Sequence, residues 1–549
     1  MGGTLNNIFC CRKILTISPS KPVATHVAVR NGRIVDVGTL NELASLGDYS
    51  LDTRFADKVL MPGLVEAHSH VMEGAFWKRI YCGYFDRTDP EGQVWPGLTT
   101  IDNLLARLSK ADRKFEDRKK PLAGWGFDPL YWGSERLKRH HLDQISTSRP
   151  IGILHASCHI LNVNTKTLKM AGLLRSGLEH PGLPLGEDGL PEGELRGHEC
   201  MALVNRHVGF MREELANDEF GFRQFAKQCV RTGITTATDL AAILPDDAVK
   251  MMLRVTAEQD FPVRIAAMRK FINLTGPDLI RVARKLGDLS TDGLRLGSIK
   301  VVADGSIQGF TARLCAQGYF NGAPNGIWYM PREHIEEVSR LALKENVQLH
   351  VHTNGDQATQ LVLECIQKGL KKHAWPDHRF TMQHCQLASR NQLKKMRELG
   401  LCANLFSNQI FFWGDLHCKY TVGPKRARNM NACRSALDIG VPIAIHSDAP
   451  ITPLSPLFTA WCAVNRLTHS GQVLGKHECI TIDEALYAIT MGAAYTLKLD
   501  SEIGSIEKGK RADFAVLEQD PTEVDIRDIK DIQVWGTVQD GRVFPASEQ

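Results

Sequence analysis

Short apolar segments alternate with longer amphipathic segments through most of the chain. The apolar segments are rich in Val, Ile, Leu and Thr, and several of them end in polar or charged residues. The segments between them carry apolar residues at helical spacing. This alternation predicts strands joined by helices, which is the pattern of a parallel sheet built from β-α units.

Eight apolar segments have the length and composition of barrel strands. They are VLMPGLVEAHSH (59 to 70), GITTATDL (233 to 240), FPVRIAAM (261 to 268), LRLGSIKVVAD (294 to 304), VQLHVHTNGD (347 to 356), HRFTMQHCQ (378 to 386), GLCANLFS (400 to 407) and VPIAIHSDAP (441 to 450). Eight β-α units close into a (β/α)8 barrel of the TIM type, whose active site lies at the carboxyl ends of the strands. The predicted fold class is therefore α/β, with a barrel over residues 59 to 502.

Both ends of the chain are rich in β-forming residues. Asn31 and Gly32 lie between alternating apolar positions, and Asp540 and Gly541 do the same near the carboxyl end. Asn-Gly and Asp-Gly pairs are strong signals for tight hairpin turns. We predict that residues 1 to 58 and 503 to 549 together form a small β-sandwich.

A long interval separates the first predicted barrel strand from the second. A segment of this length needs structure of its own, so we predict an inserted lobe over the barrel mouth at about residues 72 to 215. Aromatic residues gather there, and they fit either the lining of a pocket for an apolar substrate or the small core of the lobe. They are Phe76, Trp77, Tyr81, Tyr84, Phe85, Trp95, Trp125, Phe127, Tyr131 and Trp132.

Composition and charge exclude several classes of partner. The 549 residues include 66 basic and 62 acidic side chains, and no basic run is long enough to follow a phosphate backbone, so we expect no nucleic acid partner. No stretch approaches the length of about eighteen apolar residues that a membrane span needs. The 14 cysteines form no Cys-x-x-Cys pair, which indicates free thiols in a reducing cytoplasm.

Metal-binding side chains stand at the carboxyl ends of four predicted strands. Residues two apart on a strand point to the same side, so each such pair can bind one ion. Imidazole nitrogen and carboxylate oxygen are ligands that suit zinc. Bound zinc lowers the pKa of its water ligand. Asp448 is our candidate to take the proton from that water and pass it to the leaving group. Any one of these histidines alone is an ordinary core or surface residue. The four strand ends carry His68 and His70, His350 and His352, His384, and His446 and Asp448.

Lys300 lies within an apolar strand, where a cation is costly unless it is paired. One interpretation is a lysine carboxylated by carbon dioxide, which would bridge two metals as an anionic ligand. The other is an ordinary interior salt bridge to Asp304 or Glu66.

Several motifs follow one another in order over nearly the whole chain: PGLVEAHSH, HASCHILNVNTKTL, GITTATDL, SIKVVADGSIQGFTARL, HVHTNGDQA, MQHCQ, HSDAPITPLSPL and GSIEKGKRADFAVL. In these motifs the chain resembles the amidohydrolase superfamily, and within it the amidohydrolase-3 branch, which includes the N-substituted formamide deformylases. The resemblance implies a composite β-sandwich and barrel that holds one or two divalent metals, usually Zn²⁺, with Mn²⁺ as an alternative.

The resemblance also assigns site residues by position. It implies carboxylated Lys300 as a bridge between a metal held by His68, His70 and Asp448 and a metal held by His352 and His384. Glu66 and Gln383 depart from the family pattern, which has Asp and commonly Glu at these positions. Two further residues match the insertion of the branch: Asn164, and His159, which is either an electrophile beside the scissile carbonyl or a packed histidine.

The predicted catalytic residues are thus Asp448 and His159. Asp304 matches the branch after the fourth strand, where it contacts substrate or holds the loop. The predicted substrate-binding residues are Trp77, Trp125, Phe127, Asn164 and Asp304.

We therefore predict a metal-dependent hydrolase that cleaves the amide C–N bond of a small, largely apolar N-acyl or N-formyl compound through metal-bound hydroxide. An alternative within enzymes is hydrolysis of a lactone, cyclic imide or aminated heterocycle, because the same attack on an sp² carbon serves all of them. A non-catalytic barrel that acts as a binding module ranks below both. The expected partner is a small-molecule substrate, and a homodimer is the commonest assembly for soluble enzymes of this size.

Overall fold

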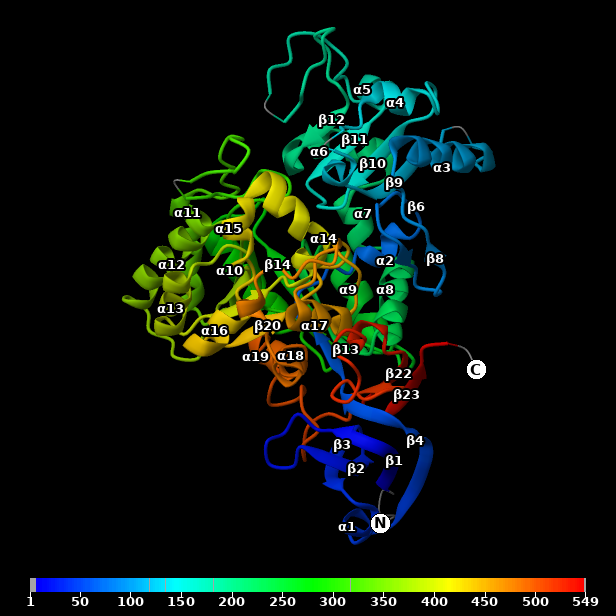
Figure 1. Cartoon of the computed structure of the whole chain (residues 1–549), viewed down its shortest axis with the longest axis vertical. Helices are drawn as coiled ribbons and strands as arrows, with labels where there is room; N and C mark the ends of the chain where they lie inside the picture. The colour runs from blue at the N-terminus through cyan, green and yellow to red at the C-terminus, as the bar shows by residue number, and fades with distance from the viewer. Residues whose placement is uncertain (1–5, 118, 134, 181, 316, 548–549) are drawn as a thin grey trace.

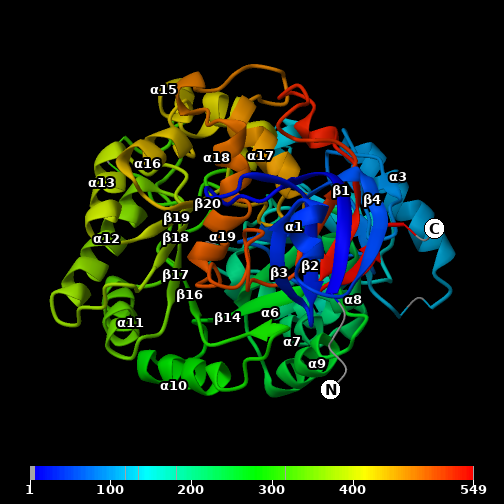
Figure 2. The same cartoon turned by 90° about the horizontal axis from the view of Figure 1, so that it is seen from below.

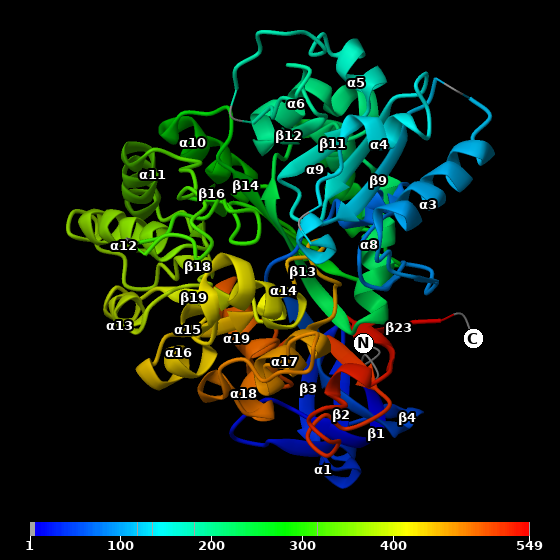
Figure 3. The ribbon, with the colours of Figure 1, turned by 45° about the horizontal axis from the view of Figure 1, so that its top comes forward.

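The parallel strands of the barrel are paired in the order in which they occur in the chain. The computed structural model describes residues 6–117, 119–133, 135–180, 182–315 and 317–547. The short strand β15 (Leu294–Arg295) pairs with the barrel strand β14 (Arg264–Lys270) and lies off the main order of the sheet. The prediction of a TIM-type α/β barrel is confirmed, and Figure 3 shows its strands inside a ring of helices. The sheet runs β5 (Leu64–Glu66), β13 (Ile234–Ala242), β14 (Arg264–Lys270), β16 (Ile299–Val302), β17 (Leu349–Thr353), β18 (Thr381–His384), β19 (Cys402–Leu405) and β20 (Ile443–Ile445).

The first and last barrel strands meet beyond their carboxyl ends. Ser69 and Ala449 form a parallel bridge there. The backbone N–H of His70 donates to the Ala449 carbonyl at 2.8 Å, and that of Asp448 donates to the His68 carbonyl at 3.0 Å. These bonds close the barrel at its mouth, so the predicted ligands of strands one and eight become neighbours.

Helices surround the strands, and their apolar faces form the main core with the outer faces of the sheet. In α10 (Gly276–Gly287), for example, Leu279, Ile280 and Ala283 are buried at helical spacing. Thr275 begins this helix by accepting a hydrogen bond from the Asp278 backbone N–H. The helices of the barrel are α8 (Glu219–Arg231), α9 (Asp246–Thr256), α10 (Gly276–Gly287), α11 (Arg332–Lys344), α12 (Asp356–Leu370), α13 (Arg390–Glu398), α14 (Asn408–Leu416), α15 (Gly423–Ala427), α16 (Cys433–Ile439), α17 (Pro456–Asn465), α18 (Ile482–Ala488) and α19 (Met491–Thr496).

Strands from the two ends of the chain lie in one mixed sheet, which occupies the bottom of Figure 1 and faces the viewer in Figure 2. Both predicted hairpin turns are present, because Asn31 and Gly32 have φ of 53° and 73°, and Asp540 and Gly541 have φ of 48° and 77°. Helix α1 (Leu40–Ala44) follows the third strand. The sheet runs β23 (Arg542–Pro545), β22 (Val534–Gln539), β21 (Phe514–Leu517), β4 (Tyr49–Pro62), β1 (Asn6–Leu15), β2 (Val23–Arg30) and β3 (Arg33–Gly38).

The chain between β5 and β13 forms a lobe with a sheet of its own, at the top of Figure 1. A hairpin of β7 (Arg87–Thr88) and β8 (Val94–Trp95) lies beside it. The sheet runs β12 (Glu194–Arg196), β11 (Ile160–Val163), β10 (Ile151–His155), β9 (Leu122–Phe127) and β6 (Ile80–Tyr81). The helices are α2 (Glu73–Phe76), α3 (Ile101–Lys114), α4 (Arg139–Asp143), α5 (Thr165–Met170), α6 (Gly197–Val208) and α7 (Arg212–Ala216).

The sequence led us to expect no membrane span and no disulfide framework. Within the described ranges, no helix has the length and apolar character that crossing a membrane requires. The 14 cysteines are all free thiols.

Candidate metal centre

The ends of strands one and eight place three predicted ligands around one point. Nε2 of His68 lies 3.3 Å from Oδ1 of Asp448, and Nε2 of His70 lies 3.2 Å from the same oxygen. His68 and Asp448 are buried, whereas the His70 side chain is 16% exposed and lies toward the cavity described below. These three ligand atoms are close enough together to share one cation.

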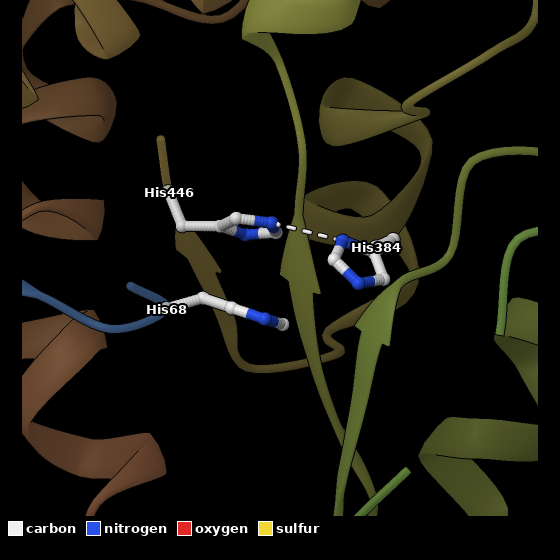
Figure 4. A group of neighbouring side chains, drawn as sticks. All are labelled: His68, His384 and His446. Atoms are coloured by element: carbon white, nitrogen blue, oxygen red, sulfur yellow. Dashed lines mark hydrogen bonds between the residues drawn. The ribbon is translucent and has the colours of Figure 1, made fainter. Parts of the chain in front are cut away.

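A second group of potential ligands shares His68 with the first. Nδ1 of His384 lies 3.1 Å from Nε2 of His446, and the His446 ring stacks on His68 with centroids 4.7 Å apart (Figure 4). His352 lies beside this group, with its ring centroid 4.5 Å from that of His384. His446 is absent from the predicted ligand set, although its position two residues before Asp448 is a signal for it.

Behind the histidines, the Ala67 backbone carbonyl fixes the orientation of the Asn404 amide, and Asn404 in turn fixes that of Gln383. Nδ2 of Asn404 donates to the Ala67 carbonyl at 3.0 Å and to Oε1 of Gln383 at 2.9 Å. Because an amide oxygen only accepts, the 2.7 Å bond between Gln383 and His68 places a proton on Nδ1 of His68. Oδ1 of Asn404 accepts from Nδ1 of His446 at 2.9 Å in the same way. Burial, together with the nearby Lys300, holds the pKa of both histidines well below the usual range, so both rings are neutral.

The neutral rings therefore point unprotonated Nε2 atoms into the site. For His68, this lone pair faces Oδ1 of Asp448, which is itself an acceptor. Two facing acceptors repel one another, and a cation between them converts the repulsion into coordination. The donor set and its protonation thus fit a divalent metal.

Glu66 ties the two strand ends together beneath this group. Its carboxylate accepts hydrogen bonds from the His68 backbone N–H at 3.1 Å and from the Ser447 hydroxyl at 2.7 Å. Burial raises the pKa of Glu66 to about 8 despite these bonds. At this position the resemblance leads us to expect Asp, and the contacts of Glu66 position the backbone of His68.

Lys300 is fully enclosed, with 1% of its surface exposed. Its Nζ has no hydrogen-bond partner in the part of the chain that the structure describes. The alternative of a salt bridge to Asp304 or Glu66 is therefore wrong. Burial lowers the pKa of Lys300 to about 7, so a large share of the amine is unprotonated near neutral pH.

Comparison with known proteins decides the family. The family model described as "Amidohydrolase family" matches residues 56–545. The chain belongs to the amidohydrolase family. With the histidine-rich centre at the barrel mouth, this membership makes the protein a metal-dependent hydrolase that acts on C–N bonds.

Relatives of this amidohydrolase are distant but extend over most of its length. The chain is 25% identical over 518 residues to "Protein LONG AFTER FAR-RED 3" of Arabidopsis thaliana, which covers 92% of this chain and 85% of the relative. It is 24% identical to "N-substituted formamide deformylase" of Arthrobacter pascens over 96% of both chains. A solved uncharacterized metal-dependent hydrolase from Pyrococcus horikoshii shares the fold with a TM-score of 0.72 and 19% identity, covering 95% of this chain and 99% of that one.

A cavity of about 160 Å³ opens above the metal centre of this amidohydrolase. The predicted ligands His68, His70, Lys300, His352, His384 and Asp448 all lie in its wall. The lobe and neighbouring helices contribute apolar side chains that include Leu215, Phe222 and Met252. The cavity has the size and mixed lining of a site for a small molecule.

His159, the predicted electrophile, also lies in the cavity wall. Its Nδ1 is 3.3 Å from the Tyr329 hydroxyl, and its ring stacks on His198 with centroids 4.9 Å apart. Burial and the nearby charges of Lys270 and Arg212 lower the pKa of His159 to about 3. The ring is thus neutral, and it is suited to donating a hydrogen bond to a carbonyl oxygen.

None of the five predicted substrate-binding side chains lines the cavity. Trp125 packs against Trp77 with centroids 5.2 Å apart, and Phe127 packs against Trp132 at 4.5 Å, so these aromatics form cores of the lobe. Asn164 caps α5 through the Thr167 backbone N–H. Asp304 accepts backbone hydrogen bonds from Arg313, Asn354 and Gly355, which holds the loop after β16.

Polar residues that sequence reasoning missed also line the cavity: Lys270, Arg212, His198 and Asp239. Lys270 is the last residue of β14. The predicted strand stopped at residue 268, two positions short of it. A basic residue at the carboxyl end of a barrel strand was the signal that could have found it.

Proposed function

We propose that this amidohydrolase cleaves the amide bond of a small N-acyl or N-formyl compound bound in the cavity above the histidines. The observation that carries the proposal is the convergence of His68, His70 and Asp448 on one point in the floor of that cavity. The similarity to an N-substituted formamide deformylase over 96% of both chains supports this choice of bond.

His68, His70 and Asp448 would hold one divalent cation, and His384 with His352 would hold a second, with His446 beside them. Zn²⁺ suits these nitrogen and oxygen donors, and Mn²⁺ is an alternative. When bound, the cation polarises the carbonyl and makes water a stronger nucleophile near neutral pH.

The protein's own side chains manage the proton and the carbonyl. The Asp448 carboxylate takes a proton from the attacking water and delivers it to the nitrogen of the leaving amine. Burial raises the pKa of Asp448, which suits it to hold that proton between the two transfers. His159, from the lobe, donates a hydrogen bond to the carbonyl oxygen as negative charge develops there.

Metal analysis together with the kinetics of Asp448→Asn tests this assignment. An amide in place of the carboxylate cannot accept the proton, so we expect turnover of an N-formyl amine to fall by at least about 100-fold. Wild-type turnover in the metal-loaded variant would refute the role of Asp448. Purified protein that neither binds metal nor hydrolyses amides with added Zn²⁺ or Mn²⁺ would instead favour the non-catalytic barrel.

Lys300 is proposed to carry a carboxyl group as a bridge between the metals. The neutral Nζ attacks carbon dioxide, a new C–N bond forms, and one proton leaves to give a carbamate anion. The enclosed, unpartnered amine supports this reaction. Native mass spectrometry should show the mass of one added carbon dioxide, and Lys300→Ala should lack it. An unmodified wild-type mass at full activity would contradict the proposal.

Lactones, cyclic imides and aminated heterocycles remain the second candidate class. They need the same attack on an sp² carbon and differ in the leaving group. Parallel assays of N-formyl amines, lactones and aminated heterocycles separate the two classes.

We further propose a cytoplasmic location, supported by the 14 free thiols, and a homodimer. No nucleic acid or membrane partner is proposed.

A further inference from the structure

Two basic side chains face the cavity from opposite parts of the fold. Lys270 ends barrel strand β14, and Arg212 begins helix α7 of the lobe. Both lie in the cavity wall. Lys270 is only 7% exposed, so its amine is removed from bulk water. The cavity therefore has a basic side that is separate from the predicted ligand set.

Neither basic group has a counter-charge in the protein. In the described ranges, no carboxylate lies within 4.0 Å of the Lys270 amine or the Arg212 guanidinium, and neither side chain donates a hydrogen bond. Two other buried cations of the chain are, by contrast, paired with carboxylates: Arg264 lies 2.7 Å from Asp513, and Arg149 lies 2.7 Å from Asp112. Burial, with the nearby Arg212 and Lys300, holds the pKa of the Lys270 amine well below its ordinary value, and an anion bound beside it would favour the protonated amine.

The acidic residues of the cavity wall are occupied elsewhere. Asp218 accepts hydrogen bonds from Lys78 at 2.6 and 2.7 Å. Asp448 lies between two histidines at the metal centre. Asp239 accepts a hydrogen bond from the Val71 backbone N–H, and burial raises its pKa to about 6. None of these three carboxylates thus pairs with Lys270 or Arg212, and a bound anion would supply that pairing.

We propose that Lys270 and Arg212 bind a carboxylate of the substrate, so that the protein hydrolyses N-acyl or N-formyl amino acids in preference to uncharged amides. An arginine guanidinium pairs well with a planar carboxylate, and a lysine adds a point charge. The apolar residues Leu215, Phe222 and Met252 would receive the amino-acid side chain. This proposal rests on the hydrolase function proposed above and names its substrate class.

Two substrates that differ only in the carboxylate test it in the metal-loaded full chain. They are N-formylleucine and N-formylisopentylamine. We expect the wild type to prefer N-formylleucine in kcat/KM by about 10- to 100-fold, which is the usual value of a charged hydrogen bond. Lys270→Met and Arg212→Gln should each raise the KM for N-formylleucine and bring the ratio of kcat/KM for N-formylleucine to that for N-formylisopentylamine toward one. Arg206→Gln, an exposed charge on α6, is the matched control and should behave as wild type.

Calorimetric titration with isocaproate, a carboxylate without an amide, separates this proposal from the hydrolase function. Isocaproate should bind the wild type, and Lys270→Met should weaken its binding by about tenfold or more. If isocaproate binds in this way while neither formyl compound is cleaved, the carboxylate site stands and the proposed hydrolysis fails. Equal cleavage of both compounds without isocaproate binding would refute the carboxylate site and leave the hydrolase function intact.

Discussion

Oε1 of Gln383 lies 2.7 Å from Nδ1 of His68. This bond sets the tautomer of a histidine whose other nitrogen faces the metal centre. The resemblance to the family leads us to expect Glu at this position, and the amide oxygen of Gln383 accepts from His68 as a carboxylate oxygen would. The same amide also donates from Nε2 to His350 at 2.8 Å, which a carboxylate cannot do.

Gln383→Leu should lower metal affinity by about 10- to 100-fold, because it removes the acceptor that orients His68. Gln383→Glu retains that acceptor and should keep most of the affinity. Competition with a chromophoric chelator measures both variants. Equal metal affinities for Gln383→Leu and wild type would show that the His68 ring needs no partner behind it.

His446→Phe should weaken metal binding by more than about tenfold, although the sequence-based ligand set omits this residue. The variant keeps an aromatic ring against Phe406, whose centroid lies 4.9 Å from that of His446, and removes both ring nitrogens. Phe406→Leu is the control that removes the stacking and keeps the nitrogens. If the two variants lose equal affinity, packing rather than His446 Nε2 accounts for the effect.

Trp125→Ala should destabilise the lobe by about 3 to 5 kcal/mol, because it opens a cavity where the ring now packs. Trp125 is 2% exposed and contacts Phe76, Trp77 and Tyr81. Thermal unfolding measures the loss of stability, and the folded fraction of Trp125→Ala should keep the wild-type KM for the substrate. Leu215→Ala, in the cavity wall, is the contrasting variant and should change KM. A selective effect of Trp125→Ala on KM without loss of stability would restore its predicted contact with substrate.

The ion pair of Arg136 and Glu194 gives the lobe a pH-dependent stability. Burial raises the pKa of Glu194, but Arg136 outweighs it, with Nε 2.8 Å from Oε2, and the pKa falls to about 2. The depressed pKa stabilises the fold above the unfolded value of about 4.3, and this contribution is lost as pH falls toward about 2.

Arg136→Gln should therefore cost about 1 to 2 kcal/mol at neutral pH, since Arg196 still donates to the carboxylate at 2.6 Å. The difference from wild type should shrink as pH falls from about 5 to about 3, where Glu194 is protonated in the variant. Lys138→Gln, which removes the pair with Glu192 at the surface, is the control and should leave the stability close to that of the wild type. Thermal unfolding across this pH range measures both, and a constant difference would contradict the role of Glu194.

The sequence by itself determined the eight barrel strands, their order, both hairpin turns and the strand ends that carry metal-binding residues. These features are local, because side chains alternate along a strand and two-residue turns need residues that accept positive φ. Parallel strands then bring their carboxyl ends to one edge, so pairs such as His68 and His70 were recognisable before any distance was known.

Only the tertiary structure decided which side chains meet across that edge. His446 joins His68 and His384 because strand eight closes against strand one. Trp125 turns into a core of the lobe, and Lys270 meets Arg212 at the cavity although 58 positions separate them in the chain. Burial and pairing depend on contacts between distant segments, and no local pattern of residues encodes them.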